Sequence, residues 1–478
     1  MAYLTFPIAL FMIIAFIMNK PPLGFFFLLA IILGSILSIR NWPIMVEYGF
    51  SSIVYLLIVA LIFFVPVSLV SAELSSGWPE KGGLYVWVKE ALGKEVGFAS
   101  VWFFWLSNVV WFPTVLAFIV STLAYSLFPF LTPVYTIGLM LLLFWAVLLS
   151  NFLGIRYSGW FGALSLILGT LLPGAILIGF GVVWIFSGNQ SHIDFSWGSL
   201  FPKNIAFRDL IFVFGLISSF AGMEMNAIHA LDVQNPRKTF PKAIFISGIA
   251  IVILTLLGIL SIGIAIPKEK IQLTTAVIEA ISTYLNHYGV KWLLPFFSLA
   301  IAFGALGGLS NWLVGISKGL YHATENATPL VPKVNRHGVP TSIMLWQGVI
   351  VSVLSFIFIA MPSASSAFWL LLVLSSQLYL ISYALMFISC IILRFKKPHV
   401  PRDYQISKGN RGVLVVAGIG FLAAVFAFLM GFVPPSQMDI GNLFFYEGFL
   451  ILGLLLSFCL PLRMRFIYHR AHREVLQR

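Results

Sequence analysis

Long apolar runs separated by short polar loops make up most of the chain, and they predict a bundle of helices that cross a membrane. Each run is close to the length of about 20 residues that an α-helix needs to span a bilayer. The runs are apolar on every face, whereas the strands of a membrane β-barrel would alternate in polarity. Twelve spans are expected, at residues 23–47, 51–70, 97–127, 134–152, 158–186, 214–243, 243–266, 291–320, 342–360, 367–393, 413–432 and 444–462.

Residues 1–22 precede the first of these spans and form an apolar N-terminal extension. Residues 1–19 are apolar and are followed by Lys20-Pro21-Pro22. The extension has no basic residue at its start and no small-residue cleavage site, so a cleaved signal peptide is not expected. A short extra helix and a segment that lies on the membrane surface are both compatible with this sequence.

Two of the spans are interrupted by residues that do not suit a continuous membrane helix. Gly34-Ser35 lies in the middle of the first span, and Ala221-Gly222-Met223-Glu224 lies in the sixth, five spans later. Glycine lets the backbone leave a helix, and broken membrane helices are tolerated only where they face protein or a wet cavity. The spacing fits a five-helix unit repeated in inverted orientation, with the first helix of each unit broken.

Such a pair of breaks predicts a substrate site halfway across the membrane. Free N–H groups at a break attract a carboxylate, and free carbonyl groups attract an ammonium group. An amino acid zwitterion carries both charges. The pattern therefore favours an amino acid over a sugar or a metal ion as the ligand.

Polar residues continue beyond the second break, where Glu224 is followed by His229 and Asp232. Ionisable groups at membrane depth cost a few kcal/mol or more, so they mark a pathway or a partner. Two interpretations of Glu224 stay open, a direct part in transport and a structural carboxylate bonded to a neighbouring helix. His229 and Asp232 do not make a zinc site by themselves, and neither a metal nor a cofactor is expected.

A second group of polar and aromatic residues lies in the eighth and tenth spans. It includes Trp312, Tyr379 and Tyr383. The two tyrosines are four residues apart and so share one face of a helix. Ordinary packing of aromatic side chains is the alternative interpretation, and packing is also the role expected for Trp111 in the third span.

Composition excludes a soluble protein. The chain of 478 residues is 60% hydrophobic and only 9% charged, with a mean hydropathy of +1.01. We therefore expect one membrane domain rather than the several soluble domains that the length alone would allow. The two cysteines, Cys390 and Cys459, lie inside apolar runs, which argues against a disulfide framework.

The net charge of +12 does not indicate a nucleic-acid partner, because the basic residues alternate between loops. Basic residues concentrate in cytoplasmic loops. With the loops after even-numbered spans in the cytoplasm, all but six of the 28 Lys and Arg residues lie on that side. The six are Arg40, Lys203, Arg208, Lys268, Lys270 and Lys291. This predicts a cytoplasmic C-terminus, with the basic tail at 463–478 near lipid headgroups.

Two stretches resemble signatures of a known transporter superfamily. Residues 77–85, Gly-Trp-Pro-Glu-Lys-Gly-Gly-Leu-Tyr, resemble the connection between the second and third helices of the amino acid–polyamine–organocation (APC) superfamily. Residues 220–224, Phe-Ala-Gly-Met-Glu, and 235–241, Asn-Pro-Arg-Lys-Thr-Phe-Pro, resemble its sixth helix and the following loop. The resemblance covers about residues 23–462, and the branch it resembles most is that of the bacterial glutamate:γ-aminobutyrate (GABA) antiporters.

This resemblance implies an all-α polytopic membrane protein of about 12 transmembrane helices, with a 5+5 inverted repeat and helices 1 and 6 broken. Residues 23–393 would form the transport core of helices 1–10, 394–462 would form helices 11 and 12, and 463–478 the cytoplasmic tail. The substrate contacts of the family correspond here to Gly34, Ser35, Ile36, Ala221, Gly222, Glu224, Trp312, Tyr379 and Tyr383.

The chain departs from the glutamate exchangers at two positions. It has Gly308 where they carry a glutamate in the eighth helix, and Arg40 where they carry a tyrosine in the first. The loss of a negative charge and the gain of a positive one would favour an anionic or neutral ligand over a cationic one, if both positions face the cavity. Specificity for glutamate and GABA is therefore in doubt.

The sequence predicts a secondary transporter of the bacterial inner membrane rather than an enzyme. Its expected partners are an amino acid, as a small-molecule substrate, and the lipid bilayer. Proton-coupled relatives can place a lysine in the fifth helix, and residues 158–186 contain none, which favours an amino acid antiporter. A proton-coupled amino acid importer is the alternative. A membrane-embedded enzyme is disfavoured, because His229 and Asp232 have no nucleophile motif nearby.

Overall fold

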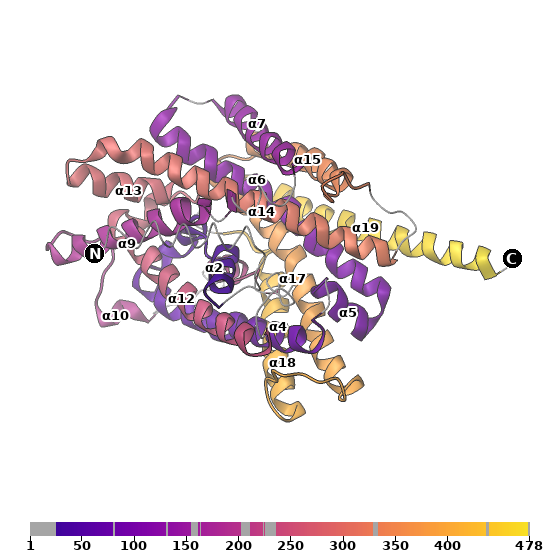
Figure 1. The fold of residues 1–478 in the computed structure, drawn as a ribbon. Helices are drawn as coiled ribbons and strands as arrows, with labels where there is room; N and C mark the ends of the chain where they lie inside the picture. Colours follow the sequence, from indigo (N-terminus) through magenta and orange to yellow (C-terminus); the bar gives the residue numbers. More distant parts are fainter. Residues whose placement is uncertain are drawn as a thin grey trace.

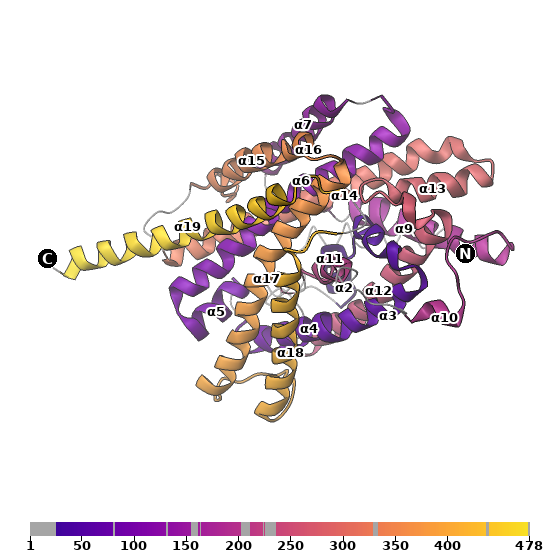
Figure 2. The same ribbon diagram turned by 180° about the vertical axis from the view of Figure 1, so that it is seen from behind.

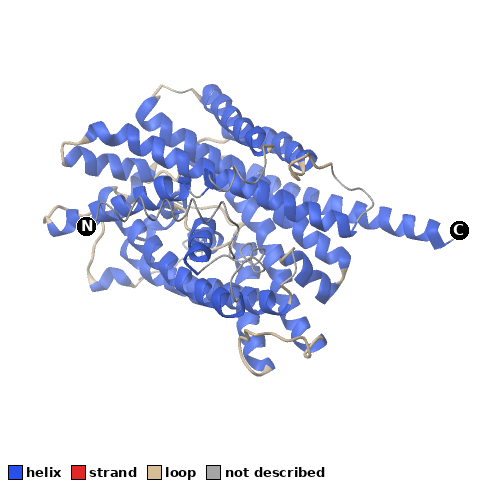
Figure 3. Cartoon of the chain, in the orientation of Figure 1, coloured by secondary structure: helices blue, strands red, loops and turns tan. Residues whose placement is uncertain are grey.

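Helices are the only regular elements in the described part of the chain (Figure 3). The computed structural model describes residues 25–79, 82–130, 132–153, 161–162, 164–201, 211–222, 224, 236–327, 333–435 and 439–476. Figure 1 shows how they are arranged. The first half comprises α2 (Phe25–Ile36), η1 (Ile39–Ser51), α3 (Ser52–Val59), η2 (Ala60–Phe64), α4 (Val65–Gly77), α5 (Leu84–Leu92), α6 (Lys94–Leu127), α7 (Pro133–Asn151), η3 (Ile167–Leu171), α9 (Leu172–Phe186), α10 (Trp197–Leu200) and α11 (Ile211–Ser219). The second half comprises α12 (Pro236–Ala265), η6 (Lys268–Lys270), α13 (Ala276–His287), η7 (Lys291–Leu293), α14 (Leu294–Ala327), α15 (Thr341–Ser355), α16 (Ile357–Ala360), α17 (Ala364–Lys396), α18 (Asn410–Met430) and α19 (Leu443–Leu476).

Ten helical stretches among the described residues are long and apolar enough to cross a membrane. They correspond to ten of the twelve predicted spans. The other two are the first and the sixth, whose described helices α2 and α11 have only 12 and 9 residues. The prediction of an all-helical polytopic membrane protein is confirmed, and the count of twelve spans stays a prediction.

Several element boundaries differ from the predicted ones, and the largest difference is at α19, which continues to Leu476 instead of ending at 462. Two other differences have a local cause. The segment η1 turns into the second span at Gly49, whose φ of +52° is a conformation that glycine adopts most easily. The helix α12 begins at Pro236, seven residues before the predicted seventh span. Proline suits the first turn of a helix, where its missing N–H has no partner in any case. Residues 236–241 of the basic stretch therefore belong to the helix instead of forming a loop.

Three long helices form the framework around the centre of the molecule. The helix α6 packs along both α14 and α17, and α17 packs along α18. The two short helices α2 and α11 lie in the middle, enclosed by the longer ones (Figures 1 and 2). The C-terminal end of α19 extends away from the rest of the chain in both views.

A close contact between two glycines fixes α14 against η3, a π-helical turn of the fifth span. A Cβ atom on Gly169 would lie 2.2 Å from the Cα of Gly304, and one on Gly304 would lie 2.5 Å from the carbonyl carbon of Gly169. Small residues let membrane helices approach this closely. The contact brings the fifth and eighth spans together beside the two short helices.

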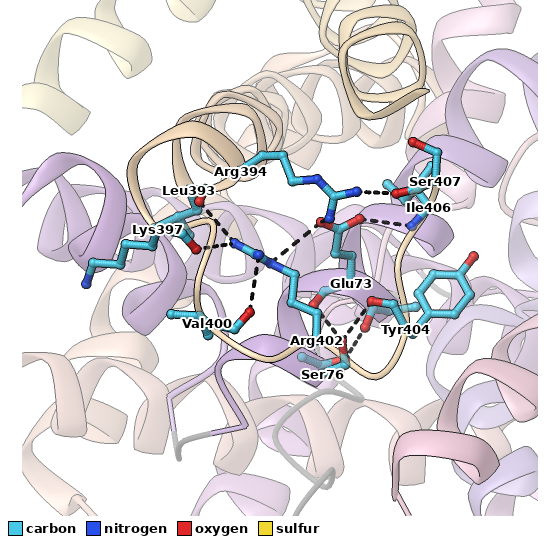
Figure 4. A network of polar contacts seen from close by, with 12 residues as sticks. Glu73, Ser76, Leu393, Arg394, Lys397, Val400, Arg402, Tyr404, Ile406 and Ser407 are labelled. Atoms are coloured by element: carbon cyan, nitrogen blue, oxygen red, sulfur yellow. Dashed lines mark hydrogen bonds and ion pairs between the residues drawn. The ribbon is translucent and has the colours of Figure 1, made fainter. Parts of the chain in front are cut away.

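A buried ion-pair network joins the end of α4 to the end of α17 and to the loop that follows α17 (Figure 4). Glu73, which is 1% exposed, accepts a hydrogen bond from Nη1 of Arg394 at 2.8 Å. Its other oxygen accepts one from the backbone N–H of Ile406 at 3.0 Å. Nε of Arg402 lies 3.7 Å from Glu73, and its guanidinium group lies over the ring of Trp78.

The same loop is tied to the helix ends by further hydrogen bonds. Arg402 donates to the carbonyl groups of Leu393 and Lys397, and Ser76 donates to the carbonyl of Tyr404 at 3.1 Å. Burial lowers the pKa of Arg402 from its ordinary value, and the Glu73 carboxylate opposes that shift. Removing one partner from a buried ion pair costs about 3–5 kcal/mol, because the other charge stays buried without a partner.

We predict that Glu73→Gln lowers the free energy of unfolding by about 3–5 kcal/mol, since two buried arginines would lose their carboxylate. Glu90→Gln is the matched control. Glu90 pairs with Lys397, but its side chain is 25% exposed, so its loss should cost less than about 1 kcal/mol. Unfolding of the purified proteins in detergent measures both. Equal stability of the two variants would contradict the structural role given to the Glu73 network.

Candidate functional site

The first span is broken between α2 and η1, at Leu37 and Ser38. Ser38 has an extended backbone, with φ −136° and ψ 114°. The prediction of a break at Gly34-Ser35 is therefore wrong by about three residues, because both residues lie in the last turn of α2. Gly34 serves close packing instead, since a Cβ there would lie 2.9 Å from the side chain of Leu166.

The residues that follow the break explain why it falls later than the glycine. Pro43 lies inside η1 and has no N–H to complete an α-helical bond to Ile39. The chain forms a 3₁₀ helix there, whose bonds span three residues instead of four. Pro43 thus disfavours an α-helix on the C-terminal side of the break, whereas Gly34 lies within α2 and does not interrupt it.

The second break lies where the sequence predicts it. The helix α11 ends at Ser219, and residues 220–222 form a turn. Gly222 has a φ of +118°, a conformation that residues with side chains rarely adopt. Its backbone N–H donates to the hydroxyl of Tyr383 at 2.9 Å, which satisfies the group that the break leaves without a helical partner.

The two breaks lie against each other. A Cβ on Gly222 would lie 3.3 Å from the carbonyl oxygen of Ser35 and 3.3 Å from the indole ring of Trp312. Only a residue without a side chain fits there without displacing its neighbours. Residues that are 187 positions apart in the chain therefore meet at the point where both helices stop.

Glu224 is held by the two tyrosines of α17. Tyr383 donates a hydrogen bond to one carboxylate oxygen at 2.5 Å, and Tyr379 donates to the other. The prediction that both tyrosines share one helical face is confirmed, with their ring centroids 4.8 Å apart. Glu224 is 4% exposed and does not line the central cavity, whereas both tyrosines do.

A cavity of about 150 Å³ lies between the breaks. One water molecule needs about 10–15 Å³ by this measure, so the space accommodates on the order of ten water molecules or one small solute. Seven of the nine predicted site residues line it, namely Gly34, Ser35, Ile36, Ala221, Trp312, Tyr379 and Tyr383. Gly222 and Glu224 adjoin the cavity without lining it.

Several polar residues of the cavity wall were not identified from the sequence. They include Ser38, Ser107, Asn108, Ser218, Ser219, Ser375 and Ser376. The adjacent polar pairs in the third and tenth spans were a usable signal, because each interrupts a long apolar run. Trp111 also lines the cavity, in addition to the packing role expected for it. His229 and Asp232 lie outside the described residues.

Arg40 is the only residue with a formal charge among the described residues that line the cavity. It is 3% exposed and donates to Thr114 at 2.8 Å and to Asn41 at 3.2 Å. Its guanidinium lies 4.6 Å from the ring centroid of Trp111 and 5.7 Å from that of Phe368. Within the described part of the chain, no carboxylate pairs with it.

The two ring contacts and two hydrogen bonds of Arg40 offset much of the cost of burying its charge, but they bring no opposite charge to it. Removing a charged group from water costs several kcal/mol. A cation–π contact returns about 0.5–2 kcal/mol, and a hydrogen bond from a charged group returns about 1.5–3 kcal/mol.

Gly308 also lines the cavity, with no atom within 4 Å of where its Cβ would lie. Both positions that depart from the glutamate exchangers therefore face the cavity.

Comparison with known proteins identifies the family. The sequence matches the amino acid permease family over residues 23–456. It is 39% identical to an uncharacterised transporter of Legionella pneumophila, over 96% of this chain and 98% of that protein. It is 28% identical to a glutamate/γ-aminobutyrate antiporter of Lactococcus lactis, over 95% and 92% of the two chains. A probable agmatine/putrescine antiporter of the same species is 24% identical, over 77% and 78%.

These matches agree with the resemblance seen in the second-to-third connection and in the sixth helix. The family consists of transporters, which move small molecules across membranes and are not enzymes. The helices of the structure and the extent of the match together define a multi-pass membrane protein. The chain belongs to the amino acid permease family of membrane transporters.

Proposed function

We propose that this protein is an amino acid antiporter of the bacterial inner membrane. It would exchange an amino acid for a related amino acid or an amine by alternating access. The observation that carries the proposal is the meeting of two interrupted helices at one cavity, where Gly222 lies beside the carbonyl of Ser35.

Three helix ends at this cavity supply groups for a zwitterion. The helices α2 and α11 end at Ile36 and Ser219, and the last carbonyl groups of a helix point out of its C-terminal end. In α11, the carbonyl groups of Ile217 and Ser218 accept hydrogen bonds from Phe220 and Ala221 in the turn that follows. The helix η1 begins at Ile39, where the first N–H groups are free of helical bonds. The carbonyl ends carry partial negative charge and the N–H end partial positive charge. An ammonium group fits the former and a carboxylate fits the latter.

The relatives support exchange rather than one-way uptake. Two of them carry the names glutamate/γ-aminobutyrate antiporter and probable agmatine/putrescine antiporter. The fifth span contains no lysine anywhere in residues 158–186. This chain therefore lacks the lysine that proton-coupled transporters can place in the fifth helix, which argues against a proton-coupled importer.

The test is uptake of labelled amino acids by the purified protein in liposomes. We expect uptake to accelerate when the liposomes are preloaded with an unlabelled amino acid, and to persist when an ionophore collapses the proton gradient. Liposomes without protein provide the background. Uptake that ignores the internal amino acid and follows the proton gradient would identify an importer, and uptake of no amino acid would contradict the proposal altogether.

We further predict that Gly222→Leu reduces exchange to the background of protein-free liposomes. The new side chain would press against the carbonyl of Ser35 and the ring of Trp312, and so would fill the gap between the breaks. The amount of protein in the membrane should stay near the wild-type level.

Gly289→Leu is the matched control for this substitution. Gly289 also has a positive φ, +71°, but no atom lies within 4 Å of where its Cβ would be. It carries a similar backbone strain away from the cavity, so this variant should exchange amino acids close to the wild-type rate. Wild-type exchange by Gly222→Leu would show that the substrate path lies elsewhere.

A further inference from the structure

We propose that Arg40 binds a second anionic group of the substrate, so that the transporter selects acidic amino acids in their ionised form and rejects cationic amines. The inference rests on the proposed amino acid exchange and narrows its substrate class. It concerns the side chain of the substrate, whereas the helix ends described above would hold its α-carboxylate and its ammonium group.

The first argument is the missing counter-charge. Arg40 is buried in the wall of the cavity, and its contacts among the described residues are neutral: Thr114, Asn41 and two aromatic rings. These contacts offset the loss of hydration, but they leave the positive charge without an opposite charge among the described residues. A carboxylate that arrives with the substrate would supply the partner that the described part of the protein lacks.

The second argument is the geometry of the donors. A guanidinium group has five N–H donors in a planar fork, and the hydrogen bonds to Thr114 and Asn41 use two of them. The donors that remain can bind both oxygens of one carboxylate, the arrangement for which arginine is best suited. The guanidinium group lies against the ring of Trp111, and both residues line the cavity.

The third argument is the position of Arg40 in the chain. It lies in the first turn of η1, directly after the break. The free N–H groups of that helix end and the guanidinium group therefore both raise the positive potential in one part of the cavity. A substrate with two carboxylates suits this part better than one with a single carboxylate.

The rest of the cavity offers little to a second positive charge. No acidic residue is present among its described lining residues, and no atom lies within 4 Å of where a Cβ of Gly308 would be. The nearby carboxylate of Glu224 is already occupied by hydrogen bonds from Tyr379 and Tyr383. A diamine such as putrescine would meet the charge of Arg40 without a carboxylate in the wall to compensate.

The experiment compares acidic amino acids with their neutral amides, which have nearly the same shape. We expect the wild-type protein to bind and exchange glutamate or aspartate at least about tenfold better than glutamine or asparagine at pH 7, since hydrogen bonds between charged groups have this magnitude. Putrescine should not exchange. Thermal-shift titration in detergent measures binding, and counterflow in liposomes measures exchange.

Substitutions then assign the preference to Arg40. Arg40→Met keeps an apolar stem but removes the charge, and it should weaken the binding of the acidic amino acid at least about tenfold with little change for the amide. Arg40→Lys should retain part of the preference, because a lysine keeps the charge but loses the fork. Lys318→Met is the control, since it removes a cation of α14 that does not line the cavity, and it should leave the preference unchanged.

Equal binding of acids and amides by the wild-type protein would overturn the inference even if the Arg40 variants fail to fold. So would an equal loss for acids and amides in Arg40→Met, which would identify Arg40 as a packing or gating residue. Exchange of neutral amino acids alone refutes this inference and leaves the proposed function intact. Exchange of no amino acid refutes the proposed function first.

Discussion

A peptide group inside a membrane has no water to bond with, so a helix can stop there only where other groups complete its hydrogen bonds. This constraint explains the centre of the molecule. The N–H of Gly222 is satisfied by the hydroxyl of Tyr383, and the bend at Gly222 packs against the last turn of α2 at Ser35. Ile36, Ile39 and Ser219, at the other helix ends, line the cavity. The cavity and the breaks therefore depend on each other, because a backbone that is interrupted in lipid must face either protein or a solute.

Glu73, Glu224 and Arg40 are all buried, and each offsets the free-energy cost of leaving water with a different kind of partner. Glu73 is paired with two arginines and a backbone N–H, and it joins α4 to α17. Glu224 is held by two tyrosine hydroxyls beside the cavity. Arg40 has neutral partners only, within the described part of the chain, and it is the one of the three that lines the cavity. A charge that is fully paired stabilises the fold, whereas a charge that is left incompletely paired at a cavity has binding capacity to offer.

The spans and the second break were predictable from the sequence, because apolar length and a glycine next to an acidic residue are local signals. The first break was predicted about three residues too early. Gly34 is needed for close packing against the side chain of Leu166 on another span, and no local pattern in the sequence reveals that contact. The pairing of Glu224 with Tyr379 and Tyr383 could be predicted only in part. The helical spacing of the two tyrosines is a local signal, but Glu224 lies 155 and 159 residues away from them in the chain. The serines of the cavity wall were missed because a serine in a membrane span commonly bonds to its own helix, as Ser107, Ser218 and Ser219 do, and only the fold shows which serines also line a cavity.

The helix α17 connects the cavity to the Glu73 network, and this limits how access can change if the protein alternates as proposed. Tyr383 and Arg394 lie on this one helix, about 16 Å apart at 1.5 Å per residue. Separating α4 from α17 would break the Glu73 network at a cost of about 3–5 kcal/mol. A movement that keeps these two helices joined avoids that cost. The movement would then fall on elements outside the network, and α2 and α11 suit it best, since each ends at a break and neither is held by a buried ion pair among the described residues.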